Sequence, residues 1–76
     1  MPRVFVLRVR KSASPHSLAS VVQHYTGMPF PEALRAVERA RAGERVELEL
    51  DDEYAAYDLA SILADLGAGA DVDESL

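Results

Sequence analysis

The sequence contains no cysteine, which excludes disulfide bonds, zinc sites built on thiolates and thiol nucleophiles. It also lacks a long apolar run near its start, because the run from Val4 to Leu7 ends at Arg8 and is far too short for a signal-peptide core or a membrane span. Glycine and proline number only 4 each, against 49% hydrophobic residues, which is typical of a chain that folds. We therefore expect a soluble, cytoplasmic protein with no membrane partner.

Positive charge is scarce as well, because 8 Lys and Arg stand against 13 Asp and Glu and the net charge is −5. Phosphate binding depends on clustered basic side chains that release counterions, so we expect no nucleic-acid partner. The charge is unevenly distributed: residues 1–43 carry seven basic and two acidic side chains, whereas residues 44–76 carry one basic and eleven acidic. This split favours ion pairing between the two halves of the fold over the steering of a charged partner.

A chain of 76 residues has room for one domain and one core. We expect a single domain over residues 1–76, with a frayed tail at 74–76. Alternation of apolar and polar residues predicts strands, and apolar residues at helical spacing predict helices. The expected order is a strand over 4–10, helices that begin at Pro15 and Pro31, a strand over 46–50, a helix that ends at Gly67 and a strand over 70–73.

Local signals indicate where the helices begin and end. Ser14 precedes a proline and is placed to cap the first helix, and Gly27 is suited to the left-handed conformation that ends it. One of the three carboxylates of residues 51–53 is placed to cap the third helix. The first strand should bury one face. Its predicted faces are Phe5, Leu7 and Val9 toward the core and Val6, Arg8 and Arg10 toward solvent.

The order of elements also predicts the topology. One helix between the second and third strands leaves these two strands parallel to each other, while the helix pair before them allows the first strand to run in the opposite direction. The result is an α+β fold, a two-layer βααβαβ sandwich whose antiparallel three-stranded sheet has the order 2-1-3 and is covered on one face by three helices. Arg8 and Arg10 would then lie between the acidic residues of the two outer strands.

Two segments resemble a known family. Thr26–Ala33 reads Thr-Gly-Met-Pro-Phe-Pro-Glu-Ala, Val37 follows, and Gly69–Asp73 reads Gly-Ala-Asp-Val-Asp. With the flanking elements, these residues resemble the C-terminal domain of the bacterial ribosomal stalk protein, L-seven/L-twelve, over nearly the whole chain. The resemblance implies the βααβαβ fold, and a function in translation, in which a basic and aliphatic patch on the first two helices recruits translation factors.

The patch itself departs from the family pattern. Residue by residue, the family's basic positions fall on Pro15, Ser20, Gln23, Pro31 and Leu34, and its exposed aliphatic positions fall on His16 and Ala19. Gly27 and Glu32 keep the family type. The chain starts at the first strand, without the family's dimerisation segment and hinge, so we expect a stand-alone divergent relative that has lost or replaced the factor-binding surface.

The protease adaptor ClpS is similar in architecture. Its adaptors hold the free N-terminal amine of a substrate with acidic residues that follow the first strand. The matching loop here, residues 11–14, reads Lys-Ser-Ala-Ser and offers no carboxylate. A ClpS-like adaptor is therefore an alternative that this loop does not favour.

Groups that could perform chemistry do not converge in the sequence. His16 and His24 are eight residues apart on a helix, about 12 Å along its axis, whereas two ligands of one metal need a spacing of four. Ser20 and His24 have the spacing of a hydrogen bond, but no acid lies on that face to orient the imidazole. The acidic residues lack the spacing of a calcium loop, and no glycine-rich loop opens a helix to bind phosphate. We expect no enzyme, no metal and no cofactor.

The remaining candidates are surface residues. Small, weakly charged side chains on the first helix suit close packing, and two tyrosines on the third helix lie outside its apolar stripe. The candidate interaction residues are His16, Ala19, Ser20, Gln23, His24, Glu32, Tyr54 and Tyr57. We expect a non-enzymatic protein-interaction domain whose partner is an unidentified protein or, through an edge strand, a second copy in a homodimer. The alternatives are contact with the ribosome or a translation factor, and a substrate-delivery adaptor whose tyrosines and acidic third helix meet a basic partner.

Overall fold

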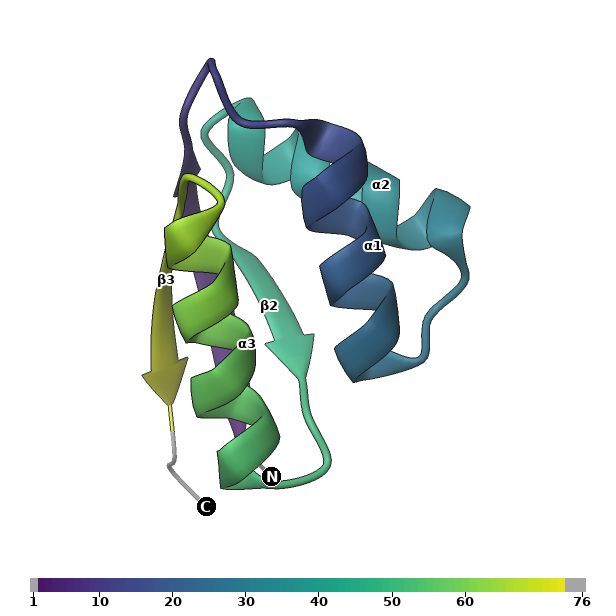
Figure 1. The fold of residues 1–76 in the computed structure, drawn as a ribbon, viewed down its shortest axis with the longest axis vertical. Coiled ribbons are helices and arrows are strands. Elements are labelled where there is room, and N and C mark those ends of the chain that lie inside the picture. Colours follow the sequence, from purple (N-terminus) through teal and green to yellow (C-terminus); the bar gives the residue numbers. More distant parts are fainter. Residues whose placement is uncertain (1, 74–76) are drawn as a thin grey trace.

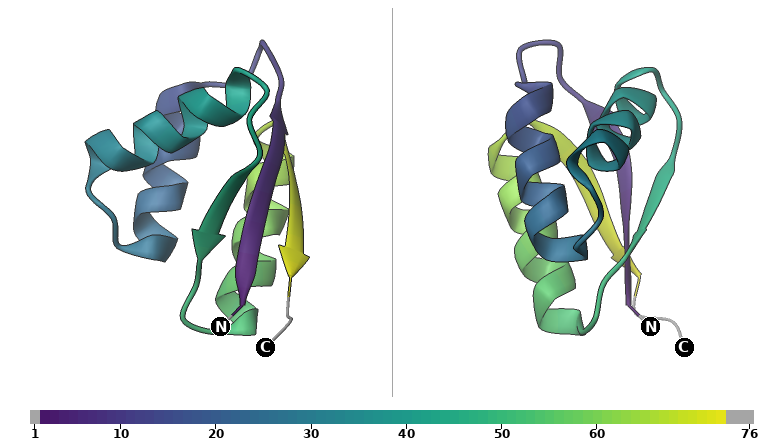
Figure 2. Two further views of the ribbon diagram at one scale, coloured as in Figure 1. Left: turned by 180° about the vertical axis from the view of Figure 1, so that it is seen from behind. Right: turned by 90° about the vertical axis from the view of Figure 1, so that its right-hand side faces the viewer.

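The computed structural model describes residues 2–73. Its elements are β1 (Arg3–Val9), α1 (Pro15–Thr26), α2 (Phe30–Arg41), β2 (Val46–Glu49), α3 (Glu53–Asp65) and β3 (Ala68–Asp73) (Figure 1). The strands form one antiparallel sheet in the order β2-β1-β3, and the helices cover one face of it (Figure 2). The predicted fold class and strand order are confirmed. None of the helices in the described part of the chain is long and apolar enough to cross a bilayer.

The ends of the helices follow the local signals in the sequence. The side chain of Ser14 accepts a hydrogen bond from the backbone N–H of Ser17 at 3.3 Å, at the start of α1. Gly27 ends α1 with φ of 77°, a left-handed conformation that costs glycine little because it has no Cβ. The side chain of Asp52 accepts a hydrogen bond of 2.8 Å from the N–H of Ala55, at the start of α3.

The core is built from the apolar side of every element. Its fully buried residues are Val4, Val6, Leu18, Ala19, Val22, Ala33, Val37, Ala40, Val46, Leu48, Leu50, Ala56, Leu59, Leu63 and Ala68. The apolar spacing predicts Leu18, Val21, Val22 and Tyr25 as the stripe of α1 and Ala33, Leu34, Val37 and Ala40 as that of α2. All of them are buried except Val21, Tyr25 and Leu34, which are half-buried. The alternation of β2 is confirmed. On α3 the apolar spacing predicts the stripe Ala55, Leu59, Ile62, Leu63 and Leu66. The observed stripe is rotated from it, because Ala56 is buried whereas Ala55 and Ile62 are only half-buried.

The predicted faces of β1 are wrong over its first half. Val4 and Val6 are buried, with 0% and 5% of their surface exposed, whereas Leu7 is 41% exposed. The pairing with β3 shifts between Val6 and Arg8, so that Leu7 is an extra residue in β1, a β-bulge. Because a one-residue slip moves each later side chain to the other face, Val6 and Val9 can both face the core.

The predicted ion pairs of the open face are wrong as well, because the acidic residues of β2 and β3 pair with the first half of β1. Arg3, and not Arg8 or Arg10, lies between the acidic residues Glu49 and Asp73 of the neighbouring strands. Its guanidinium lies 3.5 Å from the carboxylate of Glu47, diagonally across the sheet. Both side chains of this pair are close to half exposed, so the pair contributes little to stability. Arg8 instead lies opposite a glycine of β3.

Substitutions on either side of the bulge test these face assignments. Val6→Ala removes two buried carbon atoms and should lower the free energy of unfolding by about 2 kcal/mol. Leu7→Ala removes three carbon atoms from a largely accessible position and should cost under about 1 kcal/mol. Urea denaturation of the two variants measures both values. A larger decrease in the free energy of unfolding for Leu7→Ala than for Val6→Ala would contradict the bulge and support the alternation predicted from the sequence.

The cap of α3 gives a second test of local structure. Asp52→Ala leaves the first N–H groups of α3 without a side-chain acceptor and should lower the free energy of unfolding by about 1 kcal/mol. The neighbouring Asp51→Ala is the matched control, because Asp51 is exposed and precedes the cap. Thermal unfolding followed by circular dichroism compares the two. Equal effects would argue that general charge at this end, and not the cap, stabilises the helix.

Candidate interaction surfaces

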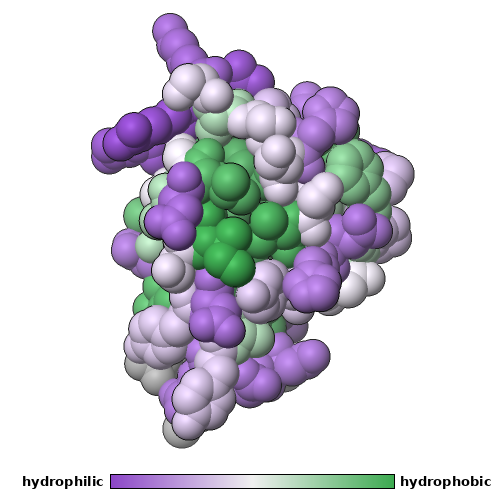
Figure 3. Space-filling view, viewed as in Figure 1, coloured by the Kyte–Doolittle hydropathy of each residue, from purple (hydrophilic) through white to green (hydrophobic). Residues whose placement is uncertain are grey.

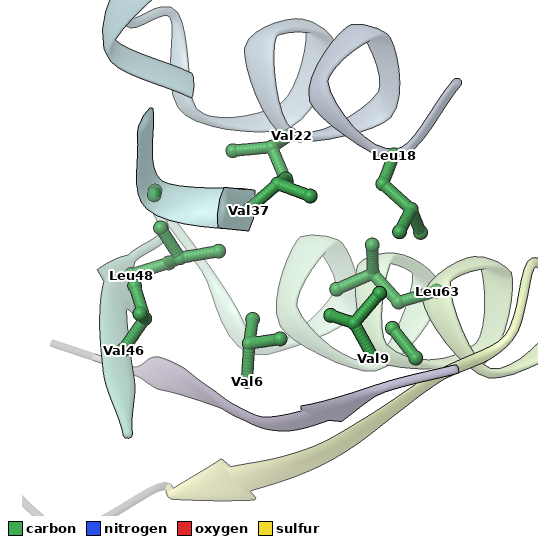
Figure 4. A pocket seen from close by; sticks show the side chains of 10 residues that line it. Val6, Val9, Leu18, Val22, Val37, Val46, Leu48 and Leu63 are labelled. Atoms are coloured by element: carbon green, nitrogen blue, oxygen red, sulfur yellow. The ribbon is translucent and has the colours of Figure 1, made fainter. Parts of the chain in front are cut away.

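A hollow inside the core is apolar. Ten side chains from the sheet and all the helices line it, among them Leu18, Val22 and Val37 from the helix pair and Leu48 and Leu63 from the other side (Figure 4). The volume of the hollow is about 10 Å³, which is at the lower limit for holding a single water molecule. No lining side chain can donate a proton or ligate an ion, so the hollow is a packing gap with no chemistry of its own.

The histidines lie at separate places on α1. The ring of His16 lies 6.0 Å from that of Phe30, centroid to centroid, at the start of α2. The ring of His24 lies 5.2 Å from that of its neighbour Tyr25. Between residues 2 and 73 no group of three or more histidines and carboxylates could hold a metal ion. Each histidine therefore serves as an aromatic surface group in this structure.

The structure does not gather the predicted interaction residues on one surface. Ala19 is completely buried, because its side of α1 packs on α2, so its expected place on the outer face is wrong. Ser20, Gln23 and His24 are exposed on the outside of α1. His16 lines a shallow hollow with residues of α2, and Glu32 lies in another hollow between α2 and β2.

The two tyrosines of α3 belong to yet another part of the surface. Tyr54 is 78% exposed and Tyr57 is 51% exposed. At helical spacing Tyr57 lies on the same flank of α3 as Ala60 and Ala64. Ala64 lines a surface hollow together with residues of β3, which places this flank beside the sheet edge that β3 forms.

The opposite flank of α3 meets α1 in an apolar strip. Half-buried side chains from both helices form it, and we call it the helical seam: Val21 and Tyr25 of α1 with Ala55 and Ile62 of α3. Figure 3 shows apolar surface at the centre of the face on which α1 and α3 lie. The sequence did not identify this strip, because its apolar spacing assigns these residues to the core. The signal that could have identified it is the width of the apolar stripe on each helix, which extends beyond the buried residues.

The charges around the helical seam have one sign. The described residues of α1 and α3 include no lysine or arginine, and Glu53, Asp58 and Asp65 are the charged residues of α3. Asp58 lies one turn before Ile62, and Asp65 one turn after Ser61, on the solvent side of the helix. The helical seam is therefore an apolar strip with an acidic border on its α3 side.

The edge formed by β3 combines small residues with two charges. The strand begins Ala68-Gly69-Ala70, and across from Gly69 lies Arg8 on β1. A Cβ on Gly69 would lie 3.7 Å from the Cβ of Arg8, so the side chain of Arg8 begins beside a position on the open face where β3 has no side chain. Asp71 follows on this face. The sequence predicted Arg8 on the open face, but it predicted neither Arg8 nor Gly69 as part of an interaction surface, although a glycine inside a strand often marks a close approach.

No model of a known protein family matches the chain, and no curated protein matches it in sequence. The resemblance to the ribosomal stalk domain therefore remains a hypothesis based on short motifs and on the order of elements.

Proposed function

We propose that this chain is a cytoplasmic, non-enzymatic protein-interaction domain whose helical seam binds a partner protein. The observation that carries the proposal is the strip of half-buried apolar side chains that lies open on the α1–α3 face (Figure 3). An apolar strip bordered by polar residues is the anatomy of a protein interface. The polar groups of residues 2–73, by contrast, form no group able to hold a metal, and the inner hollow has an apolar lining.

The charges around the seam point to the chemistry of the partner. Because α3 offers carboxylates and α1 offers no lysine or arginine, a partner with basic residues beside an apolar ridge is attracted on the α3 side and meets no lysine or arginine on the α1 side. An amphipathic helix fits this surface, since it can lay apolar side chains at helical spacing along an apolar strip between two helices. The occupant of the helical seam is therefore a basic amphipathic helix of another protein.

Variants with a matched control test this proposal. Asp58→Lys and Ile62→Ser change the border and the strip of the helical seam, and Glu38→Lys on the exposed side of α2 is the control. A partner captured by the unaltered chain should be lost with the two seam variants and kept with the control. Its affinity, measured with the purified partner, should fall about three- to tenfold for Asp58→Lys at low salt and less at high salt.

Two outcomes would contradict the proposal. Capture that the seam variants leave unchanged would place the interface elsewhere on the molecule. Recovery of no protein at all, together with turnover of a small molecule by the purified chain, would argue for an enzyme. Circular dichroism of each variant separates a lost interface from a lost fold.

Contact with the ribosome is the second candidate function. It is supported by the βααβαβ order of elements and by the turn between α1 and α2. In this turn the N–H of Met28 donates a hydrogen bond of 3.3 Å to the side-chain oxygen of Thr26. The positions that are basic in the stalk family include Ser20 and Gln23, which are exposed and neutral. We therefore expect no co-sedimentation with ribosomes and no binding to elongation factors. Binding that survives Asp58→Lys would support a retained stalk function.

A further inference from the structure

β3 is an edge strand whose outer side has no backbone partner among residues 2–73. It pairs with β1 alone, and over residues 68–72 the strand takes part in none of the backbone hydrogen bonds that lie outside the helices and the sheet. An edge of this kind presents free N–H and C=O groups and is ready to accept another strand. In Figure 1 it lies at the left margin of the molecule, with α3 on one side of it only.

The surroundings of this edge leave room for another chain. Ala64, Gly69, Ala70 and Asp71 are among the residues that line a surface hollow of about 380 Å³. Because the alanines are small and glycine has no side chain, a second backbone can approach without a clash. The other edge, β2, is shorter, with 4 residues against 6.

The charges along β3 are self-complementary. On the open face Arg8 of β1 lies opposite Gly69 of β3, and Asp71 follows Gly69 two residues later on the same face of β3. If two copies of β3 pair antiparallel about a two-fold axis through Ala70, Asp71 of each copy lies opposite Gly69 of the other. The backbones of β1 and of the added strand are about 10 Å apart, a span that extended arginine and aspartate side chains cover together over the glycine. Two equivalent Arg8–Asp71 ion pairs then form across the axis.

From this pattern we infer that the β3 edges of two copies of the chain pair antiparallel in a homodimer. The two sheets then form one continuous sheet, and Arg8 of each copy pairs with Asp71 of the other. The same axis brings the flanks of the two α3 helices alongside each other, with the half-exposed Tyr57 of one copy beside Ala64 of the other. Pairing through β2 is disfavoured, because Glu47 and Glu49 would face each other as like charges. The inference does not depend on the helical seam, which lies on the other flank of α3.

The test uses charge-reversed chains, purified and mixed. Sedimentation equilibrium of the unaltered chain should show a dimer that dissociates on dilution and with added salt. Arg8→Asp and Asp71→Arg each bring like charges together twice per dimer and should weaken dimerisation about ten- to hundredfold. An equimolar mixture of these two variants restores opposite charges at both contacts and should form a heterodimer. Glu38→Lys on α2 is the control and should dimerise as the unaltered chain does.

Hydrogen exchange of the backbone amides supplies the second readout. In the dimer, the outward-facing amides of β3 should exchange more slowly at high protein concentration, while the exchange rate of those at the outer side of β2 should not change.

A chain that stays monomeric at millimolar concentration overturns the inference. So does a mixture of the two variants that does not associate although each variant is folded. If the seam variants keep their partner, only the proposed function is contradicted, because the dimer is measured on the purified chain alone.

Discussion

β1 is the strand on which the other elements depend, because it is hydrogen-bonded on both sides, to β2 and to β3. A central strand must present apolar side chains to the helices along its whole length, and its backbone must match two registers at once. The bulge at Leu7 satisfies both demands: Val4 and Val6 fill the core before it, and Val9 packs on the core after it.

The same bulge determines the charges of the open sheet face. Before it, Arg3 and Phe5 face solvent, and Phe5 lies beneath the guanidinium of Arg45 at 4.1 Å from the ring centroid. After it, Arg8 faces solvent opposite Gly69. Without the bulge Arg8 would point toward the core, where a buried unpaired charge is costly. The placement of a basic side chain at the β3 edge is therefore a consequence of how the core is filled.

Most of the fold could be predicted because its signals are local. Ser14 and Gly27 mark the ends of α1 by the physics of capping, and the strict alternation over 46–50 specifies the faces of β2. The bulge could not be predicted, because Val4 to Leu7 are all apolar and either register buries two of them. Only the pairing of β3 against β1, a contact between residues distant in sequence, selects the register.

Candidate surfaces were harder to predict than the fold for a related reason. Exposure of a single residue depends on neighbouring elements, so Ala19 reads as an outer residue of α1 until α2 is placed against it, where it is buried completely. The helical seam and the β3 edge each combine residues from two elements, and no periodicity within one element reveals them. Both surfaces lie on α3, on opposite flanks, so one helix can contribute to a self-association edge and to a partner groove without the two competing for the same side chains. A domain with so small a core gains stability from each surface that it covers, which makes binding at either flank favourable to the fold as well.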